Sequence, residues 1–188
     1  MDFKSTKMYK KGELGEQIVD NLILNKGKFI PYAPVLEEAH IFDRIVASKD
    51  KRKLMIVEIK TVDARDKYPD TGISIGHYKE YIEIQEEYNI DVWILFVDAK
   101  NKKIYGNTLN KLSEPTELEH KGKALVYPMI WDNFTAVGKK IIYFPLMNMY
   151  DVCVLSDEQV AKLVELNNKG YKEGLAWKDG YNEWATIK

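Results

Sequence analysis

The first part of the chain changes from a helical to an extended pattern of apolar residues. Over residues 9–24, apolar side chains recur three and four positions apart, at Leu14, Ile18, Val19, Leu22 and Ile23. This spacing predicts an amphipathic helix that ends near Gly27. Residues 28–36 contain Pro31 and Pro34, so we expect an extended or irregular segment there.

Two short apolar runs follow, with a charged turn between them. Residues 40–47 and 54–61 are rich in Ile, Val, Leu and Met, whereas residues 48–53 are polar and charged. This pattern predicts a β-hairpin. Residues 62–75 are polar and include proline and glycine, so we expect a loop.

The middle of the chain predicts one helix and two strands. Residues 76–88 carry a stripe at helical spacing that consists of Tyr78, Tyr81, Ile82, Gln85 and Tyr88. Residues 91–97 form an almost continuous apolar run, which is typical of a strand buried on both faces. Residues 103–109 predict a further strand.

The last third predicts a polar connection over residues 110–122, followed by more regular structure. Ser156 and Gln159 have the spacing of a capping box, which marks the start of a helix. The expected elements are strands over 123–131 and 139–146 and a helix over 157–168. The final 18 residues are loop-like but aromatic, and we expect them to pack on their own domain or on a partner subunit.

The order of these elements predicts an α/β fold with a central mixed β-sheet flanked by helices. A length of 188 residues suits a single domain, here residues 1–188. Residues 107–188 form an extension that adds β-strands and a C-terminal helix to the core.

Composition excludes several classes of protein. With 45% hydrophobic and 30% charged residues, the chain has the balance of a globular domain. The longest apolar runs, Val92 to Val97 and Ile141 to Met147, are far shorter than the roughly 20 residues that cross a bilayer, so no membrane partner is expected. The lysine-rich start is not followed by an apolar stretch, so we expect no secretory signal. The single cysteine, Cys153, excludes an intramolecular disulfide, and we expect a cytoplasmic location.

Candidate chemistry lies on the predicted hairpin. Glu58 and Lys60 are two residues apart in one strand, so they share a face. If the hairpin is symmetric about residues 50 and 51, Asp43 lies opposite Glu58. Opposed carboxylates repel each other, and a cation between them removes the repulsion. Hard oxygen ligands of this kind suit Mg²⁺ or Mn²⁺.

The pattern of Asp43, then fourteen residues, then Glu58, Ile59 and Lys60 resembles the PD-(D/E)XK nuclease superfamily, which has the restriction-endonuclease-like fold and includes Holliday-junction resolvases. The run from Gly12 to Glu16 resembles the first helix of this family. The resemblance covers residues 9–106, the nuclease-like core. Two departures are Phe42, where many members carry proline, and His77, where glutamine is common.

The resemblance implies a metal-dependent endonuclease that hydrolyses phosphodiester bonds, with DNA as the expected partner. Asp43, Glu58 and the Ile59 carbonyl would hold Mg²⁺ or Mn²⁺. Lys60 would act on the attacking water and on the phosphate. Glu16, or alternatively Glu13, would reach the metal through water or hold a second ion.

Two further residues and one rival function remain open at this point. His77 and Tyr78 begin the helix beside the expected site, where they would either contact substrate or serve capping and packing. The rival is a non-catalytic protein that binds nucleic acid or another partner and retains the nuclease fold. A homodimer is compatible with the resemblance, because a duplex has two strands to cut.

Overall fold

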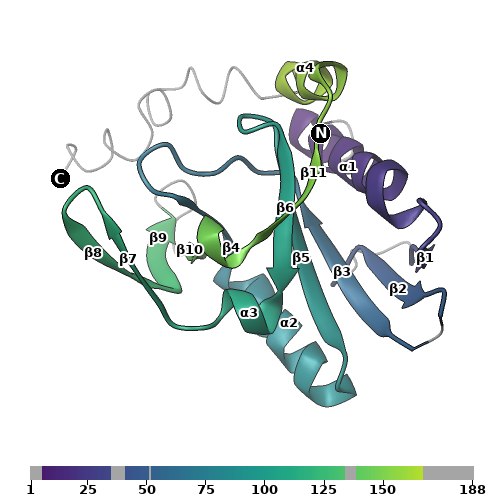
Figure 1. Ribbon diagram of the computed structural model, residues 1–188, viewed down its shortest axis with the longest axis horizontal. Helices are drawn as coiled ribbons and strands as arrows, with labels where there is room; N and C mark the ends of the chain where they lie inside the picture. Colours follow the sequence, from purple (N-terminus) through teal and green to yellow (C-terminus); the bar gives the residue numbers. More distant parts are fainter. Residues whose placement is uncertain (1–5, 35–40, 51, 134–138, 167–188) are drawn as a thin grey trace.

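A six-stranded mixed sheet forms the centre of the protein in the computed structural model, which describes residues 6–34, 41–50, 52–133 and 139–166 (Figure 1). The strand order is β1-β2-β3-β5-β6-β11. Their bounds are β1 Phe29–Tyr32, β2 Arg44–Ser48, β3 Leu54–Lys60, β5 Asp91–Asp98, β6 Lys103–Thr108 and β11 Tyr150–Val154. β3 and β5 are parallel, and the other neighbouring pairs are antiparallel. The predicted fold class is confirmed.

Two helices cover one face of this sheet (Figure 1). α1 (Lys7–Val19) starts at Thr6, whose side chain caps it, and continues into the π-helical turn η2 (Asp20–Leu24). α4 (Asp157–Glu165) starts with the predicted capping box. The core under these helices contains Ile18, Val19, Leu24, Val46, Val57, Ile59, Leu95, Val97, Ile104, Leu155 and Leu163.

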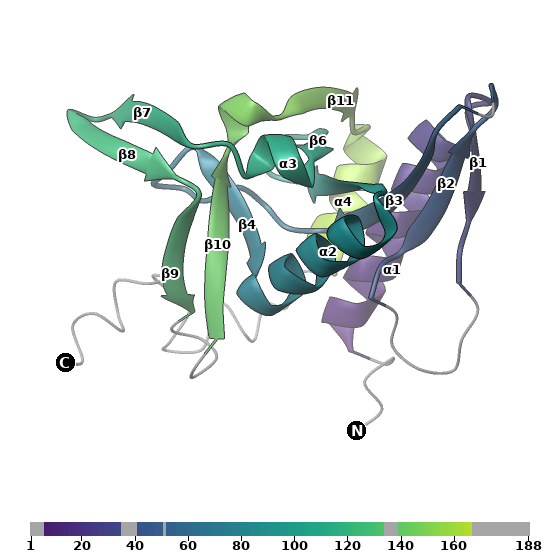
Figure 2. The same cartoon turned by 90° about the horizontal axis from the view of Figure 1, so that it is seen from below.

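α2 (Ile75–Tyr88) and a smaller sheet cover the opposite face (Figure 2). The smaller sheet has the order β4-β10-β9, with β4 Asp70–Ser74, β10 Lys139–Pro145 and β9 Met129–Asn133. The remaining elements are α3 Leu109–Leu112, η3 Leu146–Asn148 and the hairpin of β7 Thr116–His120 and β8 Lys123–Tyr127. The second core contains Ile56, Ile73, Tyr81, Val92, Ile94, Phe96, Tyr105, Leu109, Leu112, Ile142 and Phe144.

The structure corrects the predicted loops. The polar segment 62–75 contains β4, and the connection 110–122 contains α3 and β7. The predicted strand 123–131 is two strands that belong to different sheets, and β11 was not predicted. These elements carry weak local patterns, and their strand partners lie far away in the chain. For example, β4 pairs with β10, about 70 residues later.

Two further points concern boundaries and membranes. The predicted first hairpin strand begins too early, because β2 starts at Arg44 and Asp43 lies one residue before it. The aromatic C-terminal tail lies outside the described residues. Among the described residues, no helix combines the length and the apolar character that crossing a membrane requires.

Candidate active site

The β2–β3 hairpin has the register that the symmetric turn predicted. Arg44 pairs with Val57 and Ile45 with Ile56. The same register, continued by one residue, sets Asp43 opposite Glu58. Asp43 Oδ2 accepts a 2.7 Å hydrogen bond from the backbone N–H of Ile59. The hairpin therefore holds the Asp43 carboxylate beside β3 at the position of Glu58.

Alternation along β3 separates two sets of side chains. Val57 and Ile59 lie in the core under α1, whereas Ile56 belongs to the core under α2. Glu58 and Lys60 share the face of Ile56. Glu58 is only 3% exposed, and Lys60 Nζ forms an ion pair with its Oε1. Glu58 Oε2 is buried and has no hydrogen-bond partner among the described residues.

This environment changes the acidity of Glu58. Burial is the largest cause, and together with the negative charge of Asp43 it raises the pKa of Glu58 from 4.5 to about 7. Lys60 and Tyr81 lower the pKa of Glu58, because they favour the charged carboxylate. Burial and the charge of Glu58 in turn raise the pKa of Tyr81. A carboxylate that is costly to ionise within the folded protein is typical of a functional site.

Glu16 approaches from the other face of the sheet. Gly15 allows this approach, because a Cβ at that position would lie 1.8 Å from Thr61 Oγ1 at the end of β3. Glu16 Oε2 accepts a 3.1 Å hydrogen bond from Arg44 Nη1. Burial, followed by the charge of Asp43, raises the pKa of Glu16, although Arg44 acts against both. Glu13, the alternative, is exposed on α1.

The structure thus brings Asp43, Glu58 and Lys60 together. The Glu16 carboxylate is instead bound by Arg44. Arg44 was missed because nothing in the local pattern marks it. Tyr81 was noted only as part of a helical stripe. It is 1% exposed and lies beside the Glu58 carboxylate.

His77 and Tyr78 begin α2 and point to different surroundings. His77 is exposed, and its ring centroid lies 6.2 Å from that of Tyr81, one turn further along the helix. The Tyr78 ring packs against Phe144 at 6.1 Å, and its hydroxyl lies 3.0 Å from Ser113 Oγ. Tyr78 therefore packs within the protein. Contact with substrate stays a prediction for both residues.

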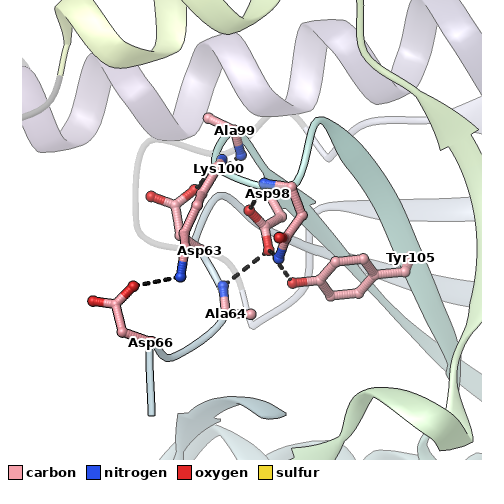
Figure 3. A network of polar contacts seen from close by, with 8 residues as sticks. Asp63, Ala64, Asp66, Asp98, Ala99, Lys100 and Tyr105 are labelled. Atoms are coloured by element: carbon pink, nitrogen blue, oxygen red, sulfur yellow. Dashed lines mark hydrogen bonds and ion pairs between the residues drawn. The ribbon is translucent and has the colours of Figure 1, made fainter. Parts of the chain in front are cut away.

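The chain after β3 is fixed by a network of buried and half-buried aspartates (Figure 3). Asp98 is 0% exposed and accepts hydrogen bonds from the Ala64 N–H at 2.9 Å and from the Tyr105 hydroxyl at 2.5 Å. Asp63 accepts a 2.9 Å bond from the Ala99 N–H. Burial opposes the charge of Asp98, but hydrogen bonds from Tyr105, Asn101 and Ala64 outweigh it and lower the pKa of Asp98. The network ties the segment that follows Lys60 to the β5–β6 turn.

Asp43 and Glu58 provide some, but not all, of the oxygen ligands that a hard divalent cation takes. No group of three or more His, Cys, Asp or Glu side chains converges on one point within the part of the chain that the structure describes. The opposed carboxylates of Asp43 and Glu58 are nevertheless the kind of oxygen donors that Mg²⁺ and Mn²⁺ take. The buried Oε2 of Glu58 has no hydrogen-bond partner in the described part of the chain. Backbone carbonyls and water complete such a shell in other proteins.

A cavity of about 970 Å³ in the described residues lies elsewhere. It is at the end of the sheet where β3 and β5 begin, and its lining includes Val46, Met55, Trp93 and Val152. Asp43, Glu58 and Lys60 do not line it. The cavity and the carboxylate site are therefore separate features.

Comparison with known proteins gives structural likenesses only. No family model and no curated protein matches the chain. The fold is similar to Hjc, a Holliday junction resolvase from Archaeoglobus fulgidus, with 10% identity, a TM-score of 0.40, and coverage of 54% of this chain and 79% of that one. It is also similar to a nuclease from a fusselovirus, with 10% identity, a TM-score of 0.39, and coverage of 84% and 87%. At this degree of likeness, the function has to be argued from the residues of the chain itself.

Proposed function

We propose that the protein is a metal-dependent nuclease that hydrolyses phosphodiester bonds in DNA. One observation carries the proposal: the hairpin register opposes Asp43 and Glu58, and Lys60 lies on the same strand face as Glu58 and forms an ion pair with it. Two acidic groups and one amine at the end of a buried strand match the residue types and the spacing of the PD-(D/E)XK resemblance.

Asp43, Glu58 and the Ile59 carbonyl would hold Mg²⁺ or Mn²⁺. When bound, such an ion polarises a phosphoryl oxygen and lowers the pKa of coordinated water. Glu58 Oε2 supports this assignment, because a buried carboxylate oxygen without a partner is costly unless a cation or a donor satisfies it. The chain provides the rest of the chemistry from its own side chains.

Lys60 would act on the attacking water and on the phosphate. Its side chain is 27% exposed, so the amine reaches solvent while it contacts Glu58. A positive charge at this position balances charge that develops on the phosphate oxygens. Glu16 would act more remotely, through water or a second ion, because Arg44 holds its carboxylate. His77 is exposed at the start of α2, where it would contact the substrate.

The decisive experiment compares cleavage by the wild type and three variants. Supercoiled, linear, single-stranded and branched DNA, together with RNA, would be incubated with Mg²⁺, Mn²⁺, Ca²⁺ or EDTA. We expect cleavage of DNA with Mg²⁺ or Mn²⁺ and none with Ca²⁺ or EDTA. Asp43→Asn and Lys60→Ala should each abolish cleavage, at a cost of about 100-fold or more in rate. Glu16→Gln should slow it less.

A matched control and a binding measurement complete the design. Lys53→Ala changes an exposed lysine at the hairpin turn and should alter only the salt dependence of binding. Mn²⁺ should raise the melting temperature of wild-type protein and of Lys60→Ala, but not that of Asp43→Asn. Normal cleavage by folded Asp43→Asn protein would falsify the assignment of this hairpin. DNA binding without cleavage or a metal effect would favour the non-catalytic alternative.

A further inference from the structure

Arg44 is the first residue of β2, directly after Asp43, and its side chain crosses to α1. Nη1 donates a 2.7 Å hydrogen bond to the backbone carbonyl of Asp43 and a 3.1 Å bond to Glu16 Oε2. Nε donates to Asp20 Oδ1 at 3.1 Å, and Nη2 donates to Asp20 Oδ2 at 2.7 Å. The guanidinium is thus bound to three acceptor groups, which lie on α1, on η2 and on the residue before β2.

Asp20 fixes the orientation of the guanidinium. A bidentate pair between a carboxylate and a guanidinium restricts both distance and angle. Asp20 lies one helical turn after Glu16, at the point where α1 widens into the π-helical turn. The Arg44 side chain is only 11% exposed, so solvent screens these contacts weakly. The remaining Nη1 bonds therefore have a defined direction.

Those Nη1 bonds reach two residues of the proposed active site that lie on different sides of the sheet. Asp43 faces Glu58 on the α2 side, and its carboxylate is held by the Ile59 N–H. Glu16 lies on α1, on the other side. One guanidinium nitrogen binds the main chain of the first residue and the carboxylate of the second. A shift of Arg44 would consequently move both groups relative to each other.

We propose that Arg44 is a positioning residue of this active site, which fixes the Asp43 main chain and directs the Glu16 carboxylate toward Asp43, with Asp20 as its anchor. The inference rests on the proposed function. Its effect on the reaction passes through Glu16 and Asp43, and Arg44 itself touches neither the water nor the phosphate. Lysine carries the same charge but lacks the planar guanidinium group with its several directed N–H donors. Arg44→Lys therefore tests whether the geometry of these hydrogen bonds is needed in addition to the positive charge.

The test is a double-mutant cycle between Arg44 and Glu16. Single-turnover cleavage rates, KM and Mn²⁺ affinity by calorimetry would be measured for wild type, Arg44→Lys, Glu16→Gln and the double variant. A misplaced group can cost about 10- to 100-fold in rate. We therefore expect Arg44→Lys to lower the cleavage rate by this factor with little change in KM. In the Glu16→Gln background, the same substitution should cost less than in wild type, because only its effect through Asp43 is left.

A matched control comes from Arg65, which forms an equivalent bidentate pair with buried Asp70. The Arg65 side chain is 13% exposed, close to the 11% of Arg44, and its hydrogen bonds go to Asp70. Arg65→Lys should lower stability as Arg44→Lys does, without the kinetic coupling to Glu16. If Arg44→Lys fails to fold, Asp20→Asn takes its place in the same cycle. This variant keeps the arginine and removes the charge of the Asp20 carboxylate.

The outcomes separate this inference from the function on which it rests. Rate losses that multiply independently, or a loss equal to that of Arg65→Lys, would overturn the positioning role while cleavage by wild type still supports the nuclease. Full rescue by lysine would likewise overturn it, because charge alone would then suffice. Wild-type protein that neither binds Mn²⁺ nor cleaves would overturn the proposed function and this inference together.

Discussion

Replacing Glu58 by glutamine removes a charge that the fold buries at the end of β3. The structure sets the magnitude, since the pKa of Glu58 rises from 4.5 to about 7, with burial as the largest cause and Asp43 as the next. One pKa unit corresponds to about 1.4 kcal/mol, so ionising Glu58 costs the folded state about 3 kcal/mol as an upper bound. Glutamine keeps the shape and does not ionise.

The sign follows from proton binding. Between pH 4.5 and about 7, the unfolded chain has released the Glu58 proton while the folded protein still holds it. The free energy of unfolding therefore falls as pH rises through this window, and this contribution is constant outside it. The stability difference between Glu58→Gln and wild type should shift by about 3 kcal/mol in favour of the variant from pH 4 to pH 8.

Urea denaturation in EDTA at constant ionic strength, followed by tryptophan fluorescence, measures this difference. Glu83→Gln, at an exposed position of α2, is the matched control for the loss of a carboxylate at the surface. Adding Mn²⁺ should reverse the order of stability at pH 8, because only the wild type provides the full metal-binding charge. A flat difference curve for Glu58→Gln, or a wild type that gains on the variant as pH rises, would refute the reasoning.

Three further predictions concern the Asp98 network, the contact of Gly15 with Thr61 and the C-terminal tail. Asp98→Asn should destabilise the protein by about 3 kcal/mol or more, because it replaces a buried acceptor of several donors, whereas Tyr105→Phe should cost about 2 kcal/mol in the same urea assay. Gly15→Ala should lower the melting temperature through its clash with Thr61, and adding Thr61→Ala should restore part of the loss; an unchanged melting curve for the single variant would contradict the close approach. Deleting residues 171–188 should lower the melting temperature or change the oligomeric mass in light scattering, whereas unchanged melting and mass with weaker DNA binding would favour base stacking by the tail aromatics.

Local sequence was sufficient for the hairpin and for the strand face that carries Glu58 and Lys60. The two apolar runs and the charged turn determine which residues pair, because the register of a short hairpin follows from its turn. The same pattern predicted α1, α2, β5 and the capping box of α4, since helical spacing, continuous apolar runs and caps are properties of neighbouring residues. These elements contain Glu58, Lys60 and Glu16, and Asp43 directly precedes β2.

Tertiary structure decided how deeply these groups are buried, which more distant residues they contact and how they ionise. The burial of Glu58 depends on α2 and Tyr81, and the position of Glu16 depends on Arg44. β4 and β11 form because distant strands supply their hydrogen-bond partners, which no local pattern reveals. Desolvation and contacts of this kind join residues that are distant in the chain. Periodicity and the hairpin register therefore predicted the elements of the site and the opposition of Asp43 and Glu58, whereas the burial of Glu58 and the contacts of Glu16 arose only from packing.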